Sequence, residues 1–206
     1  MIIHEMTQGS PEWHQVKCGK ISSSCMSDVM AKGRGNAESK TRRSYMIRLI
    51  AERLSGIPQE TYCNGAMQWG IETEPLARQA YEYAELTVVD QVGFVETSEY
   101  LGCSPDGFVG DRGLLEIKCP NTTTHVEYLL DNRLPPAYVN QVQSQLWICE
   151  REYCDFVSFD PRLICKPYFK TRVERDEEKI KELKIETEIF INELLELEHK
   201  IKGELA

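Results

Sequence analysis

The sequence lacks long hydrophobic runs. Its longest apolar stretches are only a few residues, whereas a helix needs roughly 20 to cross a bilayer. Its first residues also lack the basic segment followed by an apolar segment that marks an export signal. No tract rich in Ser, Gly or Pro and no internal repeat divides the chain. We therefore expect one soluble, cytoplasmic domain over 1–206.

Closely spaced cysteine pairs are also missing. The eight cysteines are scattered and no Cys-x-x-Cys occurs, which argues against a disulfide framework. An iron–sulfur cluster needs four cysteine ligands with close spacing, and Cys149, Cys154 and Cys165 do not supply it. The pattern indicates reduced thiols that are mostly buried.

The chain has no overall positive charge. Its net charge of −9 argues against indiscriminate nucleic-acid binding, because phosphate contacts need clustered Lys and Arg. The distribution is uneven, however. Residues 17–53 carry nine basic and three acidic side chains, whereas 171–206 carry eleven acidic and seven basic ones. One end of the chain can face a polyanion while the other faces water.

Hydrophobic periodicity predicts a mixed α/β (α+β) protein. The predicted helices cover 22–31, 38–54, 71–85, 123–131, 137–149 and a long amphipathic segment over about 171–206. The predicted strands cover 86–90, 92–96, 100–104, 106–110, 114–119, 155–160 and 166–170. This order suggests a central mixed sheet flanked by helices.

One stretch, "SPDGFVGDRGLLEIKC", carries an aspartate, a glutamate and a lysine at fixed offsets. Asp106 follows a proline, Glu116 lies ten residues on, and Lys118 lies two beyond that. Side chains alternate along a strand, so Glu116 and Lys118 project from one surface while Leu115 and Ile117 point into the core. If the strands around the "VGDRG" turn form a hairpin, Asp106 stands beside Glu116.

Neighbouring carboxylates raise each other's pKa unless a cation lies between them, and Mg²⁺ prefers such oxygen ligands. The Lys118 ammonium can orient or help deprotonate a water, or neutralise charge that develops on phosphorus. These residues therefore suggest phosphodiester hydrolysis. A simpler interpretation stays open. Asp106 fits a Ser-Pro-Asp-Gly turn, and Glu116 with Lys118 fits a solvated strand face.

Polar residues elsewhere fit either interpretation. Glu74 precedes Pro75 near the start of the helix predicted at 71–85. An acid there favours the helix dipole, and it can also act as a third metal-directed carboxylate. Gln141 and Gln145 are four residues apart and share one helix face. Their amides can position water or phosphate beside the acids, or simply face solvent.

Several segments, in their order along the chain, resemble the lambda exonuclease/YqaJ viral recombinase family. These are the phage-type alkaline exonucleases of the PD-(D/E)xK nuclease superfamily. The segments are "GSPEWHQVKCGKISSS", "MQWGIETEPLARQAYE", "GCSPDGFVGDRGLLEIKCP", "NQVQSQLW", "FDPR" and "VERDEE". They span nearly the whole chain and are far more specific than the acidic pair alone. The resemblance implies a single nuclease domain with a restriction-endonuclease-like core.

The resemblance also implies a Mg²⁺-dependent enzyme. Such an enzyme digests one strand of linear duplex DNA from its 5′ end, releases mononucleotides and leaves a 3′ single strand for annealing-type recombination. Asp106, Glu116 and the main-chain carbonyl of Ile117 match the family's metal ligands, supported by Glu74. The catalytic residues implied are Asp106, Glu116, Lys118, Glu74 and Gln141. We expect two Mg²⁺ ions about 3.5–4 Å apart, which Mn²⁺ can replace.

DNA-binding residues follow from the same resemblance. Lys17 and Ser24 fall where the family holds the 5′-terminal phosphate, and Arg34 matches a basic residue in a loop that arches over the strand. The best-known relative has arginine where this chain has Lys17, which keeps the charge but loses the bidentate fork. "NTTTHVEY" lacks another arginine of that relative, so the contacts available for processive digestion are weaker.

The family commonly forms a ring-shaped trimer around DNA and works beside a single-strand annealing protein. The implied partners are therefore 5′-phosphorylated duplex DNA, further copies of the chain and an annealing protein. The implied location is the cytoplasm of a bacterial host, with the gene carried by a phage or prophage. If residues 17–53 line the ring's opening, an acidic exterior confines attraction to threaded DNA. Trp13 is expected to pack beneath the phosphate pocket.

Other functions stay open on the residues alone. An endonuclease of the same superfamily would cut closed circular duplex DNA, which an exonuclease would not. A non-catalytic module would keep the fold and use its basic face to bind DNA or a recombination partner. The presence of Asp106, Glu116 and Lys118 together argues against that module, because a protein without catalytic activity does not need these three residues.

Overall fold

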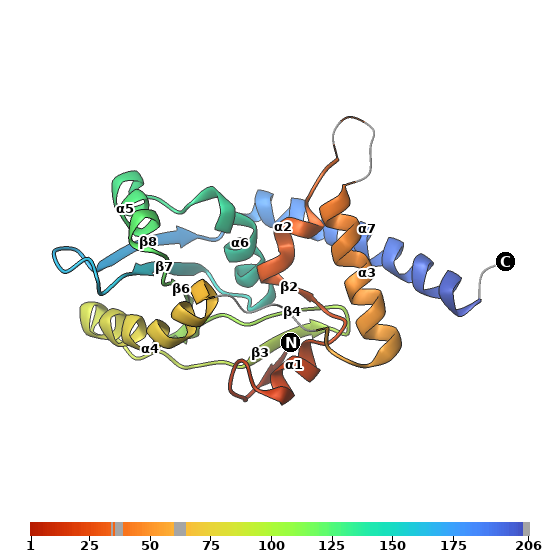
Figure 1. Ribbon diagram of the computed structural model, residues 1–206, viewed down its shortest axis with the longest axis horizontal. Coiled ribbons are helices and arrows are strands. Elements are labelled where there is room, and N and C mark those ends of the chain that lie inside the picture. Colours follow the sequence, from red (N-terminus) through yellow and green to blue (C-terminus); the bar gives the residue numbers. More distant parts are fainter. Residues whose placement is uncertain (34, 36–38, 60–64, 204–206) are drawn as a thin grey trace.

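Helices and strands build a layered, mixed α/β structure, which confirms the predicted class (Figure 1). The computed structural model describes residues 1–33, 35, 39–59 and 65–203. Arg34, expected in a DNA-facing loop, lies outside these residues. Within the described chain, no helix is both long and apolar enough to cross a bilayer.

The helices lie around the sheets and range from short to very long (Figure 1). The α-helices are α1 (Pro11–Lys17), α2 (Met26–Val29), α3 (Lys40–Ser55), α4 (Gly65–Glu85), α5 (Thr122–Asp131), α6 (Val139–Ile148) and α7 (Glu177–Lys202). The 3₁₀ helices are η1 (Ser23–Cys25) and η2 (Pro136–Tyr138).

The strands divide into two four-stranded sheets. The first sheet, in order β1-β3-β4-β2, contains β1 (Ile2–His4), β2 (Ile21–Ser22), β3 (Phe94–Ser98) and β4 (Leu101–Cys103). The second, in order β5-β6-β7-β8, contains β5 (Gly107–Val109), β6 (Gly113–Lys118), β7 (Tyr153–Phe159) and β8 (Tyr168–Glu174). Each sheet is mixed, because β2 runs parallel to β4 and β6 runs parallel to β7.

The chain passes from the first sheet to the second between β4 and β5. Pro105 lies in this connection, and since proline has no N–H it cannot extend a strand ladder. Asp106 follows directly and is therefore placed where the two sheets meet. Residues 86–90, predicted as a strand, contribute only a bridge from Asp90 to Phe108 at the edge of β5.

Helix α3 was predicted over 38–54. Local interactions determine where it begins and ends. The hydroxyl of Ser39 accepts the N–H of Arg42 and caps the first turn. Gly56 ends the helix in the left-handed conformation, with φ of 69°, which glycine adopts without strain. The helix predicted at 22–31 is confirmed in part: 23–29 are helical, but as the 3₁₀ helix η1 followed by the short helix α2, and Ser22 ends β2.

Two other helices differ from their predicted starts. Helix α4 begins at Gly65, before the predicted residue 71, so Pro75 lies inside it. Helix α7 begins only at Glu177, capped by the side chain of Asp176. The residues from 171 onward that were assigned to this helix pair with β7 instead, because β8 continues to Glu174.

Strand β6 is covered on both faces. On one face Leu115 and Ile117 pack with Ala77 and Tyr81 of α4. On the other face Leu114 belongs to the main core, together with Val142 and Leu146 of α6. The solvated strand face considered for Glu116 is therefore wrong, because Glu116 is only 1% exposed.

The acidic helix α7 packs against the basic helix α3 (Figure 1). Arg53 of α3 donates to Glu198 at 2.7 Å, and Arg42 forms an ion pair with Glu193. The acidic end of the chain thus neutralises part of the basic segment 17–53 instead of facing only water.

The described cysteines are free thiols, as the sequence predicts, and Cys63 lies outside the described residues. Cys103 and Cys149 are buried with their sulfur atoms 3.4 Å apart. This is far longer than a disulfide bond of about 2.05 Å, so the pair is a contact between two thiols in the main core.

Candidate active site

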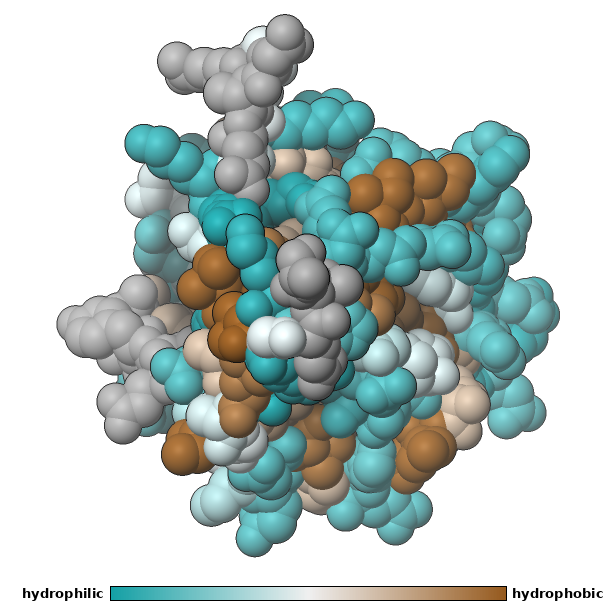
Figure 2. Space-filling model, turned by 90° about the vertical axis from the view of Figure 1, so that its right-hand side faces the viewer, coloured by the Kyte–Doolittle hydropathy of each residue, from teal (hydrophilic) through white to brown (hydrophobic). Residues whose placement is uncertain are grey.

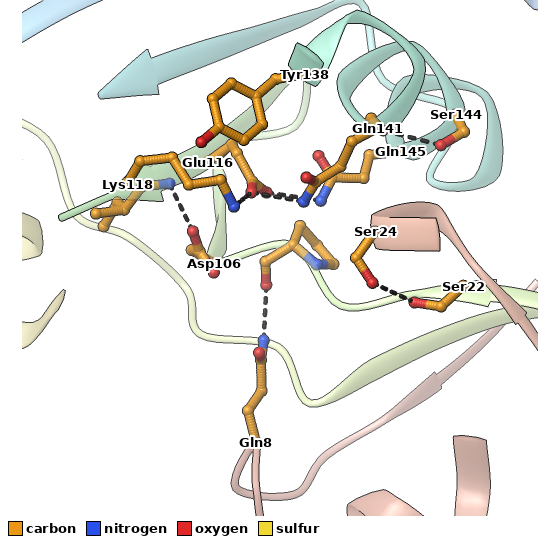
Figure 3. Close-up of polar contacts among 12 residues, drawn as sticks. Gln8, Ser22, Ser24, Asp106, Glu116, Lys118, Tyr138, Gln141, Ser144 and Gln145 are labelled. Carbon is orange, nitrogen blue, oxygen red and sulfur yellow. Dashed lines mark hydrogen bonds and ion pairs between the residues drawn. The ribbon is translucent and has the colours of Figure 1, made fainter. Parts of the chain in front are cut away.

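The hairpin of β5 and β6 places Asp106 opposite β6. Gly107 pairs with Leu115, and the N–H of Asp106 donates to the Leu115 carbonyl at 3.1 Å. The Asp106 carboxylate turns back to β6, where its Oδ2 accepts the N–H of Ile117 at 2.5 Å. Asp106 is therefore fixed at both its backbone and its side chain, beside Glu116 (Figure 3).

Glu116 on β6 is buried, and donors surround it. Its Oε1 accepts Lys118 Nζ at 2.5 Å and Gln141 Nε2 at 2.6 Å. Its Oε2 accepts Gln145 Nε2 at 2.7 Å (Figure 3). A buried carboxylate needs such partners, and here one cation and two amides hold it in a single orientation.

Both amides come from one face of α6, as their spacing predicts. Gln141 is half-buried, whereas Gln145 is 1% exposed. The Oε1 atom of Gln145 has no hydrogen-bond partner among the described residues. The residues alone offered both amides, because their interval of four places them on one helix face, whereas the resemblance implied a catalytic role for Gln141 only.

Electrostatics disfavour a charged Asp106 at this position. Burial raises the pKa of Asp106 well above its usual range, and the negative charges of Glu116 and Glu74 raise it further. The charge of Lys118 and the N–H of Ile117 act in the opposite direction without cancelling that effect. A cation near Asp106 and Glu116 would remove this repulsion.

The donor set of this site suits a hard divalent cation. Oδ1 of Asp106 accepts no hydrogen bond from the described residues, so it is free to act as a ligand. Within the described ranges, no three side chains of His, Cys, Asp or Glu lie close enough to enclose an ion. Two carboxylates without a third fit an ion that keeps several waters, as Mg²⁺ does.

Lys118 is held as a cation beside the two carboxylates. Burial lowers the pKa of Lys118, but the charges of Glu116 and Asp106 and the hydrogen bond to Glu116 outweigh burial and raise it above its usual value. Its Nζ also lies 5.2 Å from the ring centre of Tyr138, a residue that sequence reasoning missed. An ammonium in this state donates hydrogen bonds and does not accept protons.

Glu74 is near the site but does not join the carboxylate pair. It lies in the interior of α4, because that helix starts earlier than predicted. Its carboxylate forms an ion pair with Arg78 at 2.5 Å, one turn along the same helix. Glu74 therefore influences Asp106 through its charge while Arg78 occupies its oxygen.

Lys17 and Ser24 belong to the N-terminal segment. Lys17 Nζ lies 3.5 Å from the ring centre of Trp13, so the indole packs against the lysine ammonium. The indole of Trp13 donates to Ser104 Oγ at 2.9 Å. Ser24 is exposed on η1, with its hydroxyl 3.2 Å from that of Ser22 (Figure 3). Helix η1 packs on α6.

Burial lowers the pKa of Lys17 to about 8. The positive charge of Arg48 also lowers it, while Cys25 acts in the opposite direction. The described part of the chain provides no ion-pair partner for Lys17. Lys17 is therefore a cation whose charge is incompletely satisfied within the protein.

The sequence and the fold match known proteins along most of the chain. Residues 12–152 match the YqaJ-like viral recombinase domain. An alkaline exonuclease from Laribacter hongkongensis, LHK-Exo, is 41% identical, with a TM-score of 0.87 over 95% of this chain and 97% of that chain. LHK-Exo in complex with dAMP matches over the same shares, at 40% identity and a TM-score of 0.87.

A more distant structure shares the fold. A phage-related exonuclease from Haemophilus somnus 129PT is 17% identical, with a TM-score of 0.68 over 91% of this chain and 99% of that chain. No curated protein matches the sequence significantly. The carboxylate pair, the lysine and the amides thus lie within a fold that known exonucleases share.

Proposed function

This chain belongs to the YqaJ-like viral recombinase domain family and is a nuclease, and from this we propose that it is a Mg²⁺-dependent DNA exonuclease. We infer that it digests one strand of linear duplex DNA from the 5′ end to mononucleotides. The remaining 3′ single strand would serve annealing-type recombination. The observation that carries the proposal is the meeting of Asp106 and Glu116 beside the Lys118 ammonium.

We assign the metal site to Asp106 and Glu116, with the main-chain carbonyl of Ile117 as a further ligand. Glu74 supports the site through its charge. When bound, the ion supplies Lewis-acid stabilisation of the charge that develops on the phosphate. The order Pro105-Asp106, then Glu116 and Lys118, is that of a PD-(D/E)xK nuclease.

The protein's own groups act around that ion. Lys118 carries its proton before the ion binds, and its ammonium is placed to donate to the attacking water or to a phosphate oxygen. Gln141 and Gln145 keep the Glu116 carboxylate in one orientation. Such fixed donors stabilise developing charge without having to reorganise during the reaction.

We assign the 5′-terminal phosphate to Lys17 and Ser24. Support comes from Lys17, whose ammonium packs on Trp13 and forms no ion pair with any described residue. A terminal phosphate carries close to two negative charges at neutral pH, so it would satisfy this cation. Arg34, assigned to the same strand by resemblance, lies outside the described residues.

The deciding experiment uses a linear duplex that is labelled at each end, and it measures how fast each label is released. Digestion in Mg²⁺ should release label from 5′ ends first, and a 5′-phosphorylated end should be preferred over a 5′-hydroxyl end. Closed circular duplex should stay intact. Cutting of the circle would indicate an endonuclease. Binding without cleavage of any substrate would indicate a non-catalytic module.

Assembly is part of the proposal. We infer that the enzyme acts as a homotrimer around DNA, beside a single-strand annealing protein. The end of the molecule formed by α3 and α7 carries hydrophobic patches among hydrophilic side chains (Figure 2), and Ile47, Leu54 and Ile201 on these helices are exposed. Light scattering of the purified chain should give three times the monomer mass. A monomer would contradict this assignment.

A further inference from the structure

The charges of the basic segment 17–53 are not equally available. Four of its basic residues are ion-paired with acids elsewhere in the fold. They are Lys20 with Glu96, Lys32 with Glu186, Arg42 with Glu193 and Arg53 with Glu198. Lys17, Lys40 and Arg48, by contrast, form no ion pair with any described residue. Among the described basic residues of 17–53, folding therefore leaves only a few available to bind an anionic ligand.

Two of these cations face one cavity. It lies between α2 and α3 and has a volume of about 510 Å³, a size typical of ligand sites. Lys40 and Arg48 line it, and both lie on the same face of α3. The other lining residues are polar or aromatic, namely Asp28, Thr41, Ser44 and Tyr45.

Two contacts hold the Arg48 guanidinium in the wall of this cavity. It lies 4.9 Å from the ring centre of Tyr45, which is itself buried, and one of its amino groups is 3.4 Å from Cys25 Sγ. Cys25 follows Ser24 in η1. Because Arg48 contacts Cys25 and Cys25 directly follows Ser24, the cavity adjoins one of the residues assigned to the 5′ phosphate.

The residues that line this cavity favour an anionic ligand. Among the lining residues that the structure describes, Asp28 is the only acid, against Lys40 and Arg48, so this part of the wall keeps a net positive charge. The hydroxyls of Thr41 and Ser44 can donate to phosphate oxygens, and a guanidinium offers a planar fork that matches phosphate. Position 17, which is lysine here, provides no such fork.

We propose that Arg48 and Lys40 form a second phosphate site, which holds a phosphate group of the DNA strand beside Lys17. This inference rests on the proposed function, because it presumes that a DNA end reaches Lys17. Either the terminal phosphate or an internal phosphodiester supplies the required chemistry.

The test measures Kd for a 5′-phosphorylated linear duplex in Ca²⁺, where we expect binding without cleavage. Arg48→Ala and Lys40→Ala should each weaken binding roughly ten-fold. Each should also lower the slope of log Kd against log salt by about one. Asp28→Asn should tighten binding, since it removes the acid. Lys181→Ala, an exposed lysine of α7, is the matched control and should bind like wild type.

Folding is separated from binding by the choice of variants. Lys40 is exposed, so its removal should leave the thermal midpoint unchanged. Arg48→Lys keeps the charge but not the fork, and should recover only part of the affinity. Wild-type affinity in both Lys40→Ala and Arg48→Ala would overturn the inference.

A 5′-hydroxyl duplex identifies which phosphate is held. If the site holds an internal phosphodiester, Arg48→Ala should weaken binding to both ends by the same factor. If it shares the terminal phosphate with Lys17, the loss should occur only with the 5′-phosphorylated end and should be absent in a Lys17→Ala background. A failure of the proposed function would give a different result from a failure of this inference. Wild type would then digest no linear duplex in Mg²⁺.

Discussion

Lys118 and Glu116 form an ion pair of 2.5 Å between two residues of the same strand, and the carboxylate is 1% exposed. Gln141 donates to the same carboxylate oxygen as Lys118. A cation that binds Glu116 must therefore compete with the lysine for that oxygen. The pair links the charge state of the lysine to occupation of the proposed metal site.

Replacing Lys118 by alanine should lower kcat by about 10²–10³-fold, the loss typical of removing one donor to a developing oxyanion. Mg²⁺ affinity should stay the same or rise, because a competitor for Glu116 has been removed. Single-turnover digestion and calorimetric titration of Mg²⁺ would measure both effects.

Lys170→Ala is the matched control, since Lys170 is also a half-buried sheet lysine paired with a glutamate, Glu85, at 2.7 Å. It should keep full activity. If Lys118→Ala lost activity only in proportion to unfolded protein, its catalytic assignment would be withdrawn.

Asp106→Asn should not destabilise the metal-free protein. The folded state raises the pKa of Asp106, so its charge costs stability at every pH above the unfolded value of about 3.9. Asparagine removes that charge and can still accept the N–H of Ile117. Thermal unfolding in EDTA at neutral pH should give a midpoint equal to or above that of wild type, while hydrolysis is lost.

Adding Mg²⁺ should raise the midpoint of wild type by mass action but not that of Asp106→Asn. Asp111→Asn, at an exposed acid of the same hairpin, should respond to Mg²⁺ like wild type. A lower midpoint for Asp106→Asn in EDTA would show that the carboxylate is structural.

Gln145→Met should lower activity while leaving the stability of the fold nearly unchanged. The change removes a donor to Glu116, so we expect kcat to fall about ten-fold, within the range for a misplaced catalytic group. It also removes the unpartnered Oε1 atom, which offsets the lost hydrogen bond. The free energy of unfolding in urea should stay within about 1 kcal/mol of wild type.

Gln143→Met on the same helix is the comparison. Gln143 is buried and both polar atoms of its amide have partners, because it donates to the Glu174 carbonyl and accepts the N–H of Asp176. That variant should lose about 1–3 kcal/mol of stability but keep its activity when folded. The reverse pattern would remove Gln145 from the site.

The preference for a 5′-phosphorylated end should fade as pH rises through about 8, where Lys17 loses its proton. The terminal phosphate titrates near pH 6, so it stays fully charged over this interval. The ratio of Kd values for 5′-hydroxyl and 5′-phosphorylated duplexes should be large at pH 7 and small at pH 9.5.

Lys17→Arg keeps its charge at all these pH values, so its preference should persist at pH 9.5. A preference that declines equally in wild type and Lys17→Arg would point to a different titrating group. In Lys17→Ala the preference should be absent at every pH.

Local rules in the sequence were sufficient for the hairpin that carries Asp106 and Glu116. Alternation of side chains and the "VGDRG" turn predict the pairing of β5 with β6, and the register confirms it. Local rules failed for the start of α4, which begins at Gly65 and continues through Pro75, although proline usually breaks a helix interior. They failed again at 171, where β8 continues by pairing with β7.

By itself, the sequence determined the spacing of Asp106, Glu116 and Lys118 and the shared face of Gln141 and Gln145, since both depend on the repeat of one strand or one helix. Tertiary structure alone decided that α6 buries Glu116 and turns Gln145 into its donor. It also decided which basic residues α7 neutralises. Burial and ion pairing arise between segments distant in the chain, and no local period encodes such contacts.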